Sequence, residues 1–147
     1  MCSSDLAAPR EVYDIITDFE AYHQWNSFTP RITLLNSEFT TGAQFDLDCR
    51  MTEATLLVNE HEEILEIRPG EFSFCMGTSR TRGRPGIRSY RWQICEPAGN
   101  NETHFINYER FEGPLAPIVL ALYSRKLKKA FDSFCLALKK RAESSLD

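Results

Sequence analysis

The sequence predicts an α+β domain in which a curved antiparallel sheet of six to seven strands wraps around one long C-terminal helix. Three observations indicate this class: a helical pattern that begins at Pro9, alternating strand-like segments between residues 32 and 111, and a helical stripe over residues 115–144. Consecutive strands joined by short turns pair antiparallel, so a meander is expected. The apolar stripe of the long helix then needs the inner face of the sheet as its partner.

The first helix is expected to begin at Pro9, because proline is favoured at the first helical position. Apolar residues follow at helical spacing over about three turns, at Val12, Ile15, Ile16 and Phe19. A short second turn of helix is expected over residues 22–26. The segment before the first helix, Met1 to Asp5, is too short to assign from its pattern alone.

From Ile32 onward the apolar period changes toward two, which is typical of strands with one buried face. Turn signals at Gly42, Pro69-Gly70 and residues 96–101 separate the segments. The side chains that we expect to share an inner face alternate along four of these segments: Phe45, Leu47, Cys49 and Met51; Phe72, Phe74 and Met76; Tyr90, Trp92 and Ile94; Phe105, Asn107, Glu109 and Phe111.

The last segment, residues 115–144, is expected to be one helix or two nearly continuous helices. Its apolar stripe has spacings of three, four and seven residues, and consists of Leu120, Tyr123, Leu127, Phe131, Phe134 and Leu138. Most of its lysines lie off this stripe. The stripe therefore predicts a helix that packs lengthwise on the sheet.

The composition predicts one globular domain over residues 1–147, with 42% hydrophobic and 26% charged residues. A net charge of −4 disfavours a nucleic-acid partner, whose phosphates require clustered Lys and Arg. No segment is long and apolar enough to span a membrane, and the first residues do not have the pattern of a secretory signal. The sequence does not indicate an oligomeric state.

Five cysteines are widely spaced and include no C-x-x-C pair, so we expect neither a disulfide framework nor a zinc site. A reduced, cytoplasmic setting is expected. The three histidines are too scattered to form a metal site, so no metal is expected. The sequence also lacks phosphate-binding glycine motifs, which argues against a nucleotide cofactor, and no cofactor of any kind is expected.

Several motifs, in their order along the chain, resemble the polyketide cyclase/dehydrase-like branch of the START-like (SRPBCC) superfamily. They are Ala8-Pro9-x-x-Val12-Tyr13 through Asp18-Phe19, Trp25-Asn26, Thr103-x-Phe105-x-x-x-Glu109-x-Phe111-x-Gly113, and residues 138–143. This resemblance implies a helix-grip fold with an internal cavity. The sequence departs from the family pattern at the short first strand and at Ser27-Phe28, where many members have proline and an apolar residue.

The resemblance implies that the chain binds a hydrophobic, aromatic or polyketide-like small molecule and promotes its cyclisation, dehydration or isomerisation with its own acid and base side chains. Because one fold serves many functions, two alternatives stay open. One is a non-enzymatic carrier or sensor of a lipid or quinone. The other is a protein-interaction module similar to the chaperone activators of the superfamily.

Three residues are candidates for proton transfer. Glu109 shares a face with Phe105 and Phe111, and a carboxyl group inside an apolar cavity has a raised pKa; the alternative is that it pairs with a cation and faces water. Tyr90 offers an orienting hydroxyl. His23 lies near the expected cavity mouth, where it is a catalytic base or a surface or capping histidine.

The residues expected to line the ligand site come from the first helical region, the inner faces of three strands and the C-terminal stripe. They are Trp25, Asn26, Phe74, Trp92, Asn107, Phe111, Tyr123, Leu127 and Phe131. For Trp92 the alternative is packing in the core. Asp46 and Asp48 are expected to face solvent, because they alternate with Phe45, Leu47 and Cys49.

Overall fold

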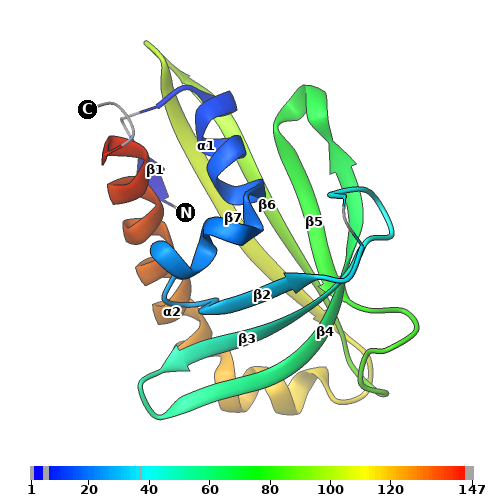
Figure 1. Cartoon of the computed structure of the whole chain (residues 1–147). Coiled ribbons are helices and arrows are strands. Elements are labelled where there is room, and N and C mark those ends of the chain that lie inside the picture. The colour runs from blue at the N-terminus through cyan, green and yellow to red at the C-terminus, as the bar shows by residue number, and fades with distance from the viewer. Residues whose placement is uncertain (1, 5–6, 37, 145–147) are drawn as a thin grey trace.

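We describe the protein from a computed structural model, in which residues 2–4, 7–36 and 38–144 are described. Within these residues one short strand precedes two consecutive short helices, further strands interrupted by a 3₁₀ turn follow, and one long helix ends the chain (Figure 1). In chain order the elements are β1 (Cys2–Ser4), α1 (Pro9–Thr17), η1 (Phe19–Gln24), β2 (Arg31–Leu34), β3 (Gln44–Thr52), β4 (Thr55–Arg68), η2 (Pro69–Glu71), β5 (Ser73–Thr78), β6 (Arg88–Gly99), β7 (Glu102–Glu112) and α2 (Ala116–Ser144).

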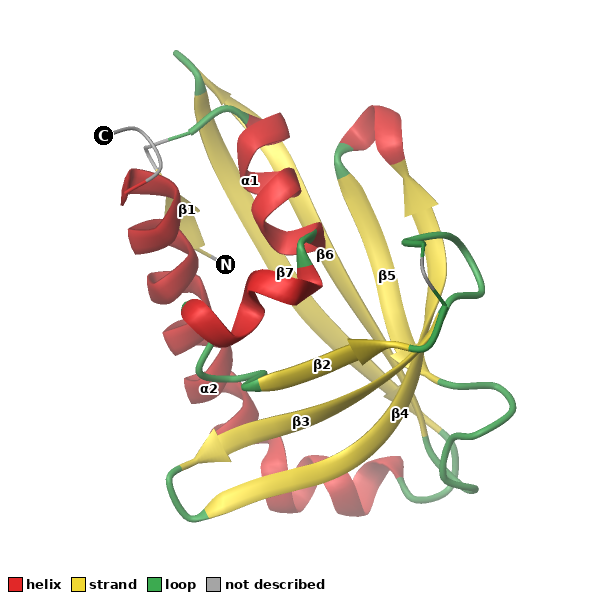
Figure 2. Ribbon diagram, in the orientation of Figure 1, coloured by secondary structure: helices red, strands yellow, loops and turns green. Residues whose placement is uncertain are grey.

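Within the described residues, seven strands form one antiparallel sheet in the order β1-β7-β6-β5-β4-β3-β2. Figure 2 shows the sheet curving, with α1, η1 and α2 on its concave side. Strands β2 to β7 follow one another as a meander, and the short β1 pairs with β7 to extend it. The fold class predicted from the sequence, a curved sheet around a long C-terminal helix, is confirmed.

The helix α1 begins at Pro9 as predicted, and the side chain of Glu11 accepts a hydrogen bond from the backbone N–H of Ala8 at 3.1 Å. Val12 and Ile16 are fully buried, because the helix packs on β6 and β7. The expected second turn is present as the 3₁₀ helix η1, which starts at Phe19 and so begins earlier than residue 22.

The helix α2 runs unbroken from Ala116 to Ser144, which confirms one continuous helix. Leu127, Phe134 and Leu138 of the predicted stripe are buried against the sheet. Leu120, however, is 43% exposed, so its inclusion in the stripe is wrong. Val119 lies on the inner side in its place.

An aromatic cluster fills one end of the concave side, between α1, η1 and the sheet. Phe19 contacts Phe39, Phe45 and Phe74 at ring-centroid distances of 5.5, 5.5 and 6.4 Å. Phe45 and Phe74 have no exposed surface. This end is therefore solid core, and open space inside the sheet has to lie at the other end.

A β-bulge in β4 changes which residues of this strand point inward. Leu47 pairs with Glu60 and Cys49 pairs with Leu57, so two residues of β4 face the single residue Asp48 of β3. The extra residue, Asn59, has a positive φ of 53°, and its N–H donates to Asp48 at 2.9 Å. Leu57 thus faces inward before the bulge and Glu60 and Glu62 face inward after it.

The inner face of β6 is the opposite of the one expected from its aromatic residues. Ser89, Arg91 and Gln93 are buried on the concave side, whereas Tyr90 and Trp92 lie on the convex side. Alternation shows which residues share a face but does not show which face is inside. The expected inward orientation of Tyr90 and Trp92 is therefore wrong.

Cations stabilise this reversed orientation on both sides of the sheet. On the convex side the guanidinium of Arg68 lies 4.4 Å from the Trp92 ring, and that of Arg110 lies 5.1 Å from the Tyr90 ring. On the concave side the guanidinium of Arg91 lies among three phenylalanine rings. Cation–π contacts therefore stabilise aromatic residues that are only half-buried and an arginine that is almost fully buried.

The cysteines differ in part from the expectation. Cys49, Cys75 and Cys95 carry free thiols, whereas Cys135 of α2 is disulfide-bonded. The expectation that the chain has no disulfide is therefore wrong. Among the described helices, none is both long and apolar enough to cross a membrane.

Candidate functional site

A cavity of about 240 Å³ lies between the inner face of β3–β7 and the first half of α2. Its wall is largely apolar, because the inward residues of β3 face the apolar side of α2. Apolar side chains in this wall include Leu47, Met51, Leu57, Met76, Val119 and Leu127. A cavity of this kind suits a small hydrophobic ligand.

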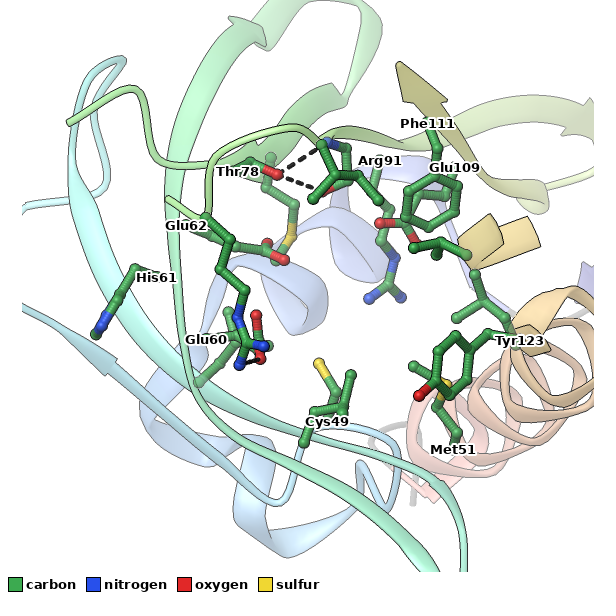
Figure 3. A pocket seen from close by; sticks show the side chains of 18 of the residues that line it. Cys49, Met51, Glu60, His61, Glu62, Thr78, Arg91, Glu109, Phe111 and Tyr123 are labelled. Carbon is green, nitrogen blue, oxygen red and sulfur yellow. Dashed lines mark hydrogen bonds and ion pairs between the residues drawn. The ribbon is translucent and has the colours of Figure 1, made fainter. Parts of the chain in front are cut away.

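Three glutamates line this space. Glu60 is paired with Arg84 at the rim, whereas Glu62 from β4 and Glu109 from β7 point into it from different parts of the sheet (Figure 3). Both are half-buried by surface area, and the surface that they expose faces the cavity. Burial raises the pKa of Glu62 to about 8, with a further contribution from the charge of Glu109. Burial also raises the pKa of Glu109, while Arg91 and a hydrogen bond from the Ser89 hydroxyl lower it.

Arg91 is the cation that faces these carboxyl groups. It is 5% exposed, and its Nε donates to Oδ1 of Asn107 at 2.8 Å. Its Cζ lies 4.9, 4.7 and 4.9 Å from the ring centres of Phe28, Phe131 and Phe134. Nη2 has no hydrogen-bond partner among the described residues, and the side chain points toward the cavity (Figure 3). Its positive charge acts on both carboxyl groups and lowers the pKa of each of them.

A pair of hydroxyl groups lies on the sheet between the two carboxyl groups. Glu62 pairs in register with Thr78 of β5, whose Oγ1 lies 3.2 Å from Oγ of Ser89 on β6. Thr78 also accepts the backbone N–H of Ser89 at 2.8 Å. Since the Ser89 hydroxyl in turn donates to Glu109, polar groups line the sheet from β4 to β7.

Ion pairs hold the loop between β5 and β6 over the rim of the cavity. Nη2 of Arg84 lies 2.7 Å from a carboxylate oxygen of Glu60. Nη1 of Arg82 lies 2.8 Å from Asp46, whose carboxylate also lies 2.8 Å from Nδ1 of His61. These contacts lower the pKa of Asp46 and leave its side chain on the convex side, as the sequence predicts.

Four residues of the predicted site line this cavity: Glu109, Phe111, Tyr123 and Leu127. They come from β7 and α2, whose inward faces, apart from Leu120, were read correctly from the sequence. Their roles in binding or catalysis stay predictions.

Five predicted ligand residues lie in the surrounding core and do not line the cavity. Trp25 and Phe131 pack against neighbouring rings, Asn26 accepts a backbone hydrogen bond from Thr29, and Phe74 belongs to the aromatic cluster. Asn107 is behind the cavity wall, where it holds Arg91. These residues support the wall of the cavity from behind and do not line it.

The other three predicted residues lie away from the cavity. Tyr90 and Trp92 line a separate hollow on the convex side. His23 is exposed, and its Nδ1 lies 2.8 Å from the carbonyl oxygen of Glu20 in η1, which is the capping arrangement that the sequence left open. None of the three is placed to contact a ligand in this cavity.

Among the cavity residues that the sequence did not predict, Glu62 and Arg91 matter most for its chemistry. Arg91 pairs with Glu109 in the register of β6 on β7. An alignment of these two strands would therefore have placed Arg91 on the same face as Glu109. Glu62 gave no such signal, because the bulge at Asn59 interrupts the alternation of β4.

No cluster of three or more His, Cys, Asp or Glu suited to a metal ion is found in the part of the chain that the structure describes. The chemistry that the cavity offers comes from the carboxyl groups of Glu62 and Glu109, the Arg91 guanidinium and the hydroxyls of Ser89 and Thr78, while the third carboxyl group, Glu60, is paired with Arg84. Such groups can hold and move protons at a bound molecule.

The fold and the cavity define a helix-grip domain with an internal small-molecule site. The sequence matches the family described as "Polyketide cyclase / dehydrase and lipid transport" over residues 4–143, and the chain belongs to this family. A comparison with curated proteins gives no match.

Solved structures share the fold at low sequence identity. The Zhui aromatase/cyclase from Streptomyces sp. R1128 superposes with a TM-score of 0.80 at 10% identity, covering 99% of this chain and 92% of that chain. The protein TTHA0849 from Thermus thermophilus gives 0.74 at 14% identity, covering 96% and 93%. Norcoclaurine synthase from Thalictrum flavum, in complex with dopamine and hydroxybenzaldehyde, gives 0.70 at 7% identity, covering 95% and 81%.

Proposed function

We propose that this protein binds a hydrophobic, aromatic or polyketide-like small molecule in the cavity between the sheet and α2. We further propose that Glu109 promotes the cyclisation, dehydration or isomerisation of this molecule as a general acid–base group. The observation that carries the proposal is a carboxyl group with a raised pKa inside a cavity whose wall is largely apolar. Burial that raises the pKa of a carboxyl group makes it a better acceptor and donor of protons in catalysis.

The family and the neighbouring structures support this proposal. The family description combines polyketide cyclases and dehydrases with lipid transport, and one structural neighbour is an aromatase/cyclase. Another neighbour holds dopamine and hydroxybenzaldehyde, which are small aromatic molecules. Confinement of a flexible chain in such a cavity would itself favour ring closure, because it holds the reacting atoms together.

Binding is tested with the fluorescent probe 1-anilinonaphthalene-8-sulfonate and a pair of neighbouring substitutions on α2. Val119 lines the cavity, whereas Leu120 is exposed. We expect Val119→Trp to weaken probe binding by about tenfold or more, because an indole fills much of the space. Leu120→Trp is the matched control and should leave binding unchanged. Equal affinity in the two variants would contradict binding in this cavity.

Catalysis is tested by the exchange of α-hydrogens of 2-tetralone with deuterium oxide, followed by NMR. Glu109→Gln should lower the protein-dependent rate by about 100-fold or more while probe binding is retained. Glu112→Gln, an exposed change on the same strand, is the control. Native mass spectrometry identifies co-purified molecules. Exchange no faster than in buffer, together with a retained lipid or quinone, would instead identify a carrier.

A further inference from the structure

We propose that Glu62 is a second catalytic residue of this cavity, which donates a proton to a ligand carbonyl oxygen while Glu109 removes a proton from the adjacent carbon. The inference rests on the proposed function and specifies its substrate as a hydrophobic ketone with at least one hydrogen on the carbon next to the carbonyl. No motif of the sequence indicated a role for Glu62.

The curved sheet directs the carboxyl groups of Glu62 and Glu109 into the same cavity. Glu62 faces inward because the bulge at Asn59 shifts the alternation of β4, and Glu109 faces inward from β7. Strands β5 and β6 lie between them, so the two groups approach the cavity from different sides of a curved wall (Figure 3). A ligand between the strands and α2 would meet both groups.

The charges around Glu62 assign the roles of acid and base. The groups that face it are Glu60 on its own strand, Cys49 on β3, Arg91 on β6 and Glu109 on β7, and α2 contributes Tyr123 to the same wall. Burial and the two neighbouring carboxylates keep the pKa of Glu62 near 8, so it retains its proton at neutral pH. The carboxylate of Glu109 is stabilised by Arg91 and accepts the hydroxyl hydrogen bond of Ser89.

The proton transfers balance without any further reactant. The C–H bond next to the carbonyl breaks, and its proton forms an O–H bond with the carboxylate of Glu109. The C–H electrons form the C=C bond of the enol, and the carbonyl π electrons take the proton of Glu62. Glu62 ends as a carboxylate and Glu109 as an acid, and the reverse transfer restores both.

The test measures 2-tetralone exchange across pH for the wild type, Glu62→Gln, Glu62→Asp and the exposed control Glu53→Gln. Since the acid must be protonated, the wild-type rate should fall as the pH rises through about 8. Glu62→Gln should lower the rate at pH 7 by about 10- to 100-fold and abolish this fall. Glu62→Asp should exchange more slowly than the wild type but should still lose activity as the pH rises. Glu53→Gln should match the wild type at every pH.

A readout without substrate separates this role from a structural one. In protein labelled with ¹³C at glutamate carboxyl carbons, one signal should titrate near pH 8, disappear in Glu62→Gln and titrate at lower pH in Glu109→Gln. If Glu109→Gln abolishes exchange and Glu62→Gln does not, the role of Glu62 is overturned and the proposed function stands. If the wild type binds the fluorescent probe without exchange, both catalytic assignments fail.

Discussion

The carboxyl of Glu62 makes the stability of this protein depend on pH in a way that one substitution should remove. Its pKa rises from 4.5 to about 8 on folding, because the folded state buries it beside Glu109. A raised folded-state pKa means that the folded protein binds the proton more tightly than the unfolded chain does. This contribution to stability is fully present below pH 4.5 and is lost as the pH rises through about 8.

The two pKa values set the size of the effect. Each pH unit between them changes the free energy of unfolding by ~1.4 kcal/mol, so Glu62 should cost the wild type up to about 5 kcal/mol above pH 8. Glutamine has nearly the same shape and carries no charge at any pH. We therefore expect Glu62→Gln to match the wild type at pH 4.5 and to exceed its stability by about 2 to 5 kcal/mol at pH 9.

Urea unfolding at pH 4.5, 7 and 9, with the disulfide of Cys135 kept oxidised, measures this difference. The control is Glu53→Gln in the exposed turn between β3 and β4. A difference between Glu62→Gln and the wild type that is the same at all three pH values would refute the reasoning, because it would show that Glu62 ionises equally easily in both states.

Two other features lead to predictions. A Cβ on Gly77 would lie 2.0 Å from the carbonyl oxygen of Ser89, whereas one on Gly70 meets nothing within 4 Å. Gly77→Ala should therefore lower the free energy of unfolding by more than about 2 kcal/mol relative to Gly70→Ala, and similar urea midpoints for the two would contradict the close packing of β5 on β6. Burial raises the pKa of the Cys49 thiol well above 9.0. This thiol should therefore react with iodoacetamide at pH 8 at least about tenfold more slowly than glutathione, as followed by peptide mass mapping. Bound fluorescent probe should slow the reaction further. Equal rates with and without the probe would place Cys49 outside the binding site.

The sequence was sufficient for the fold because its strongest signals are regular. Alternation between Phe45 and Met51 and between Phe105 and Phe111 places these faces inside, and the stripe of α2 packs against the sheet except at Leu120. The pairing of β3 with β4 is irregular between Arg50 and Thr52, but Met51 still lines the cavity, so the pattern of β3 holds. The candidate site was predicted only where it rests on them, at β7 and α2.

The remaining parts of the site depend on information that alternation does not carry. For β6 the two faces were grouped correctly, but an aromatic face was taken as the inner one. The structure instead buries Arg91, because three rings and Asn107 surround its guanidinium, and it covers Trp92 with Arg68. Such partners lie far apart in the sequence, so they appear only when the strands are assembled.

The bulge at Asn59 lets two parts of β4 whose alternation is out of phase present one inner face. Leu57 and Glu60 are three residues apart, a spacing that places two residues of a regular strand on opposite faces, and the extra residue brings both of them inside. Deletion of Asn59 would leave Val58 opposite Asp48 and restore strict alternation, and Glu60 and Glu62 would still face the cavity. Insertion of a further residue on either side of the bulge would instead turn one part of the strand over. The acidic character of the cavity therefore tolerates the loss of this residue but not the gain of another one beside it.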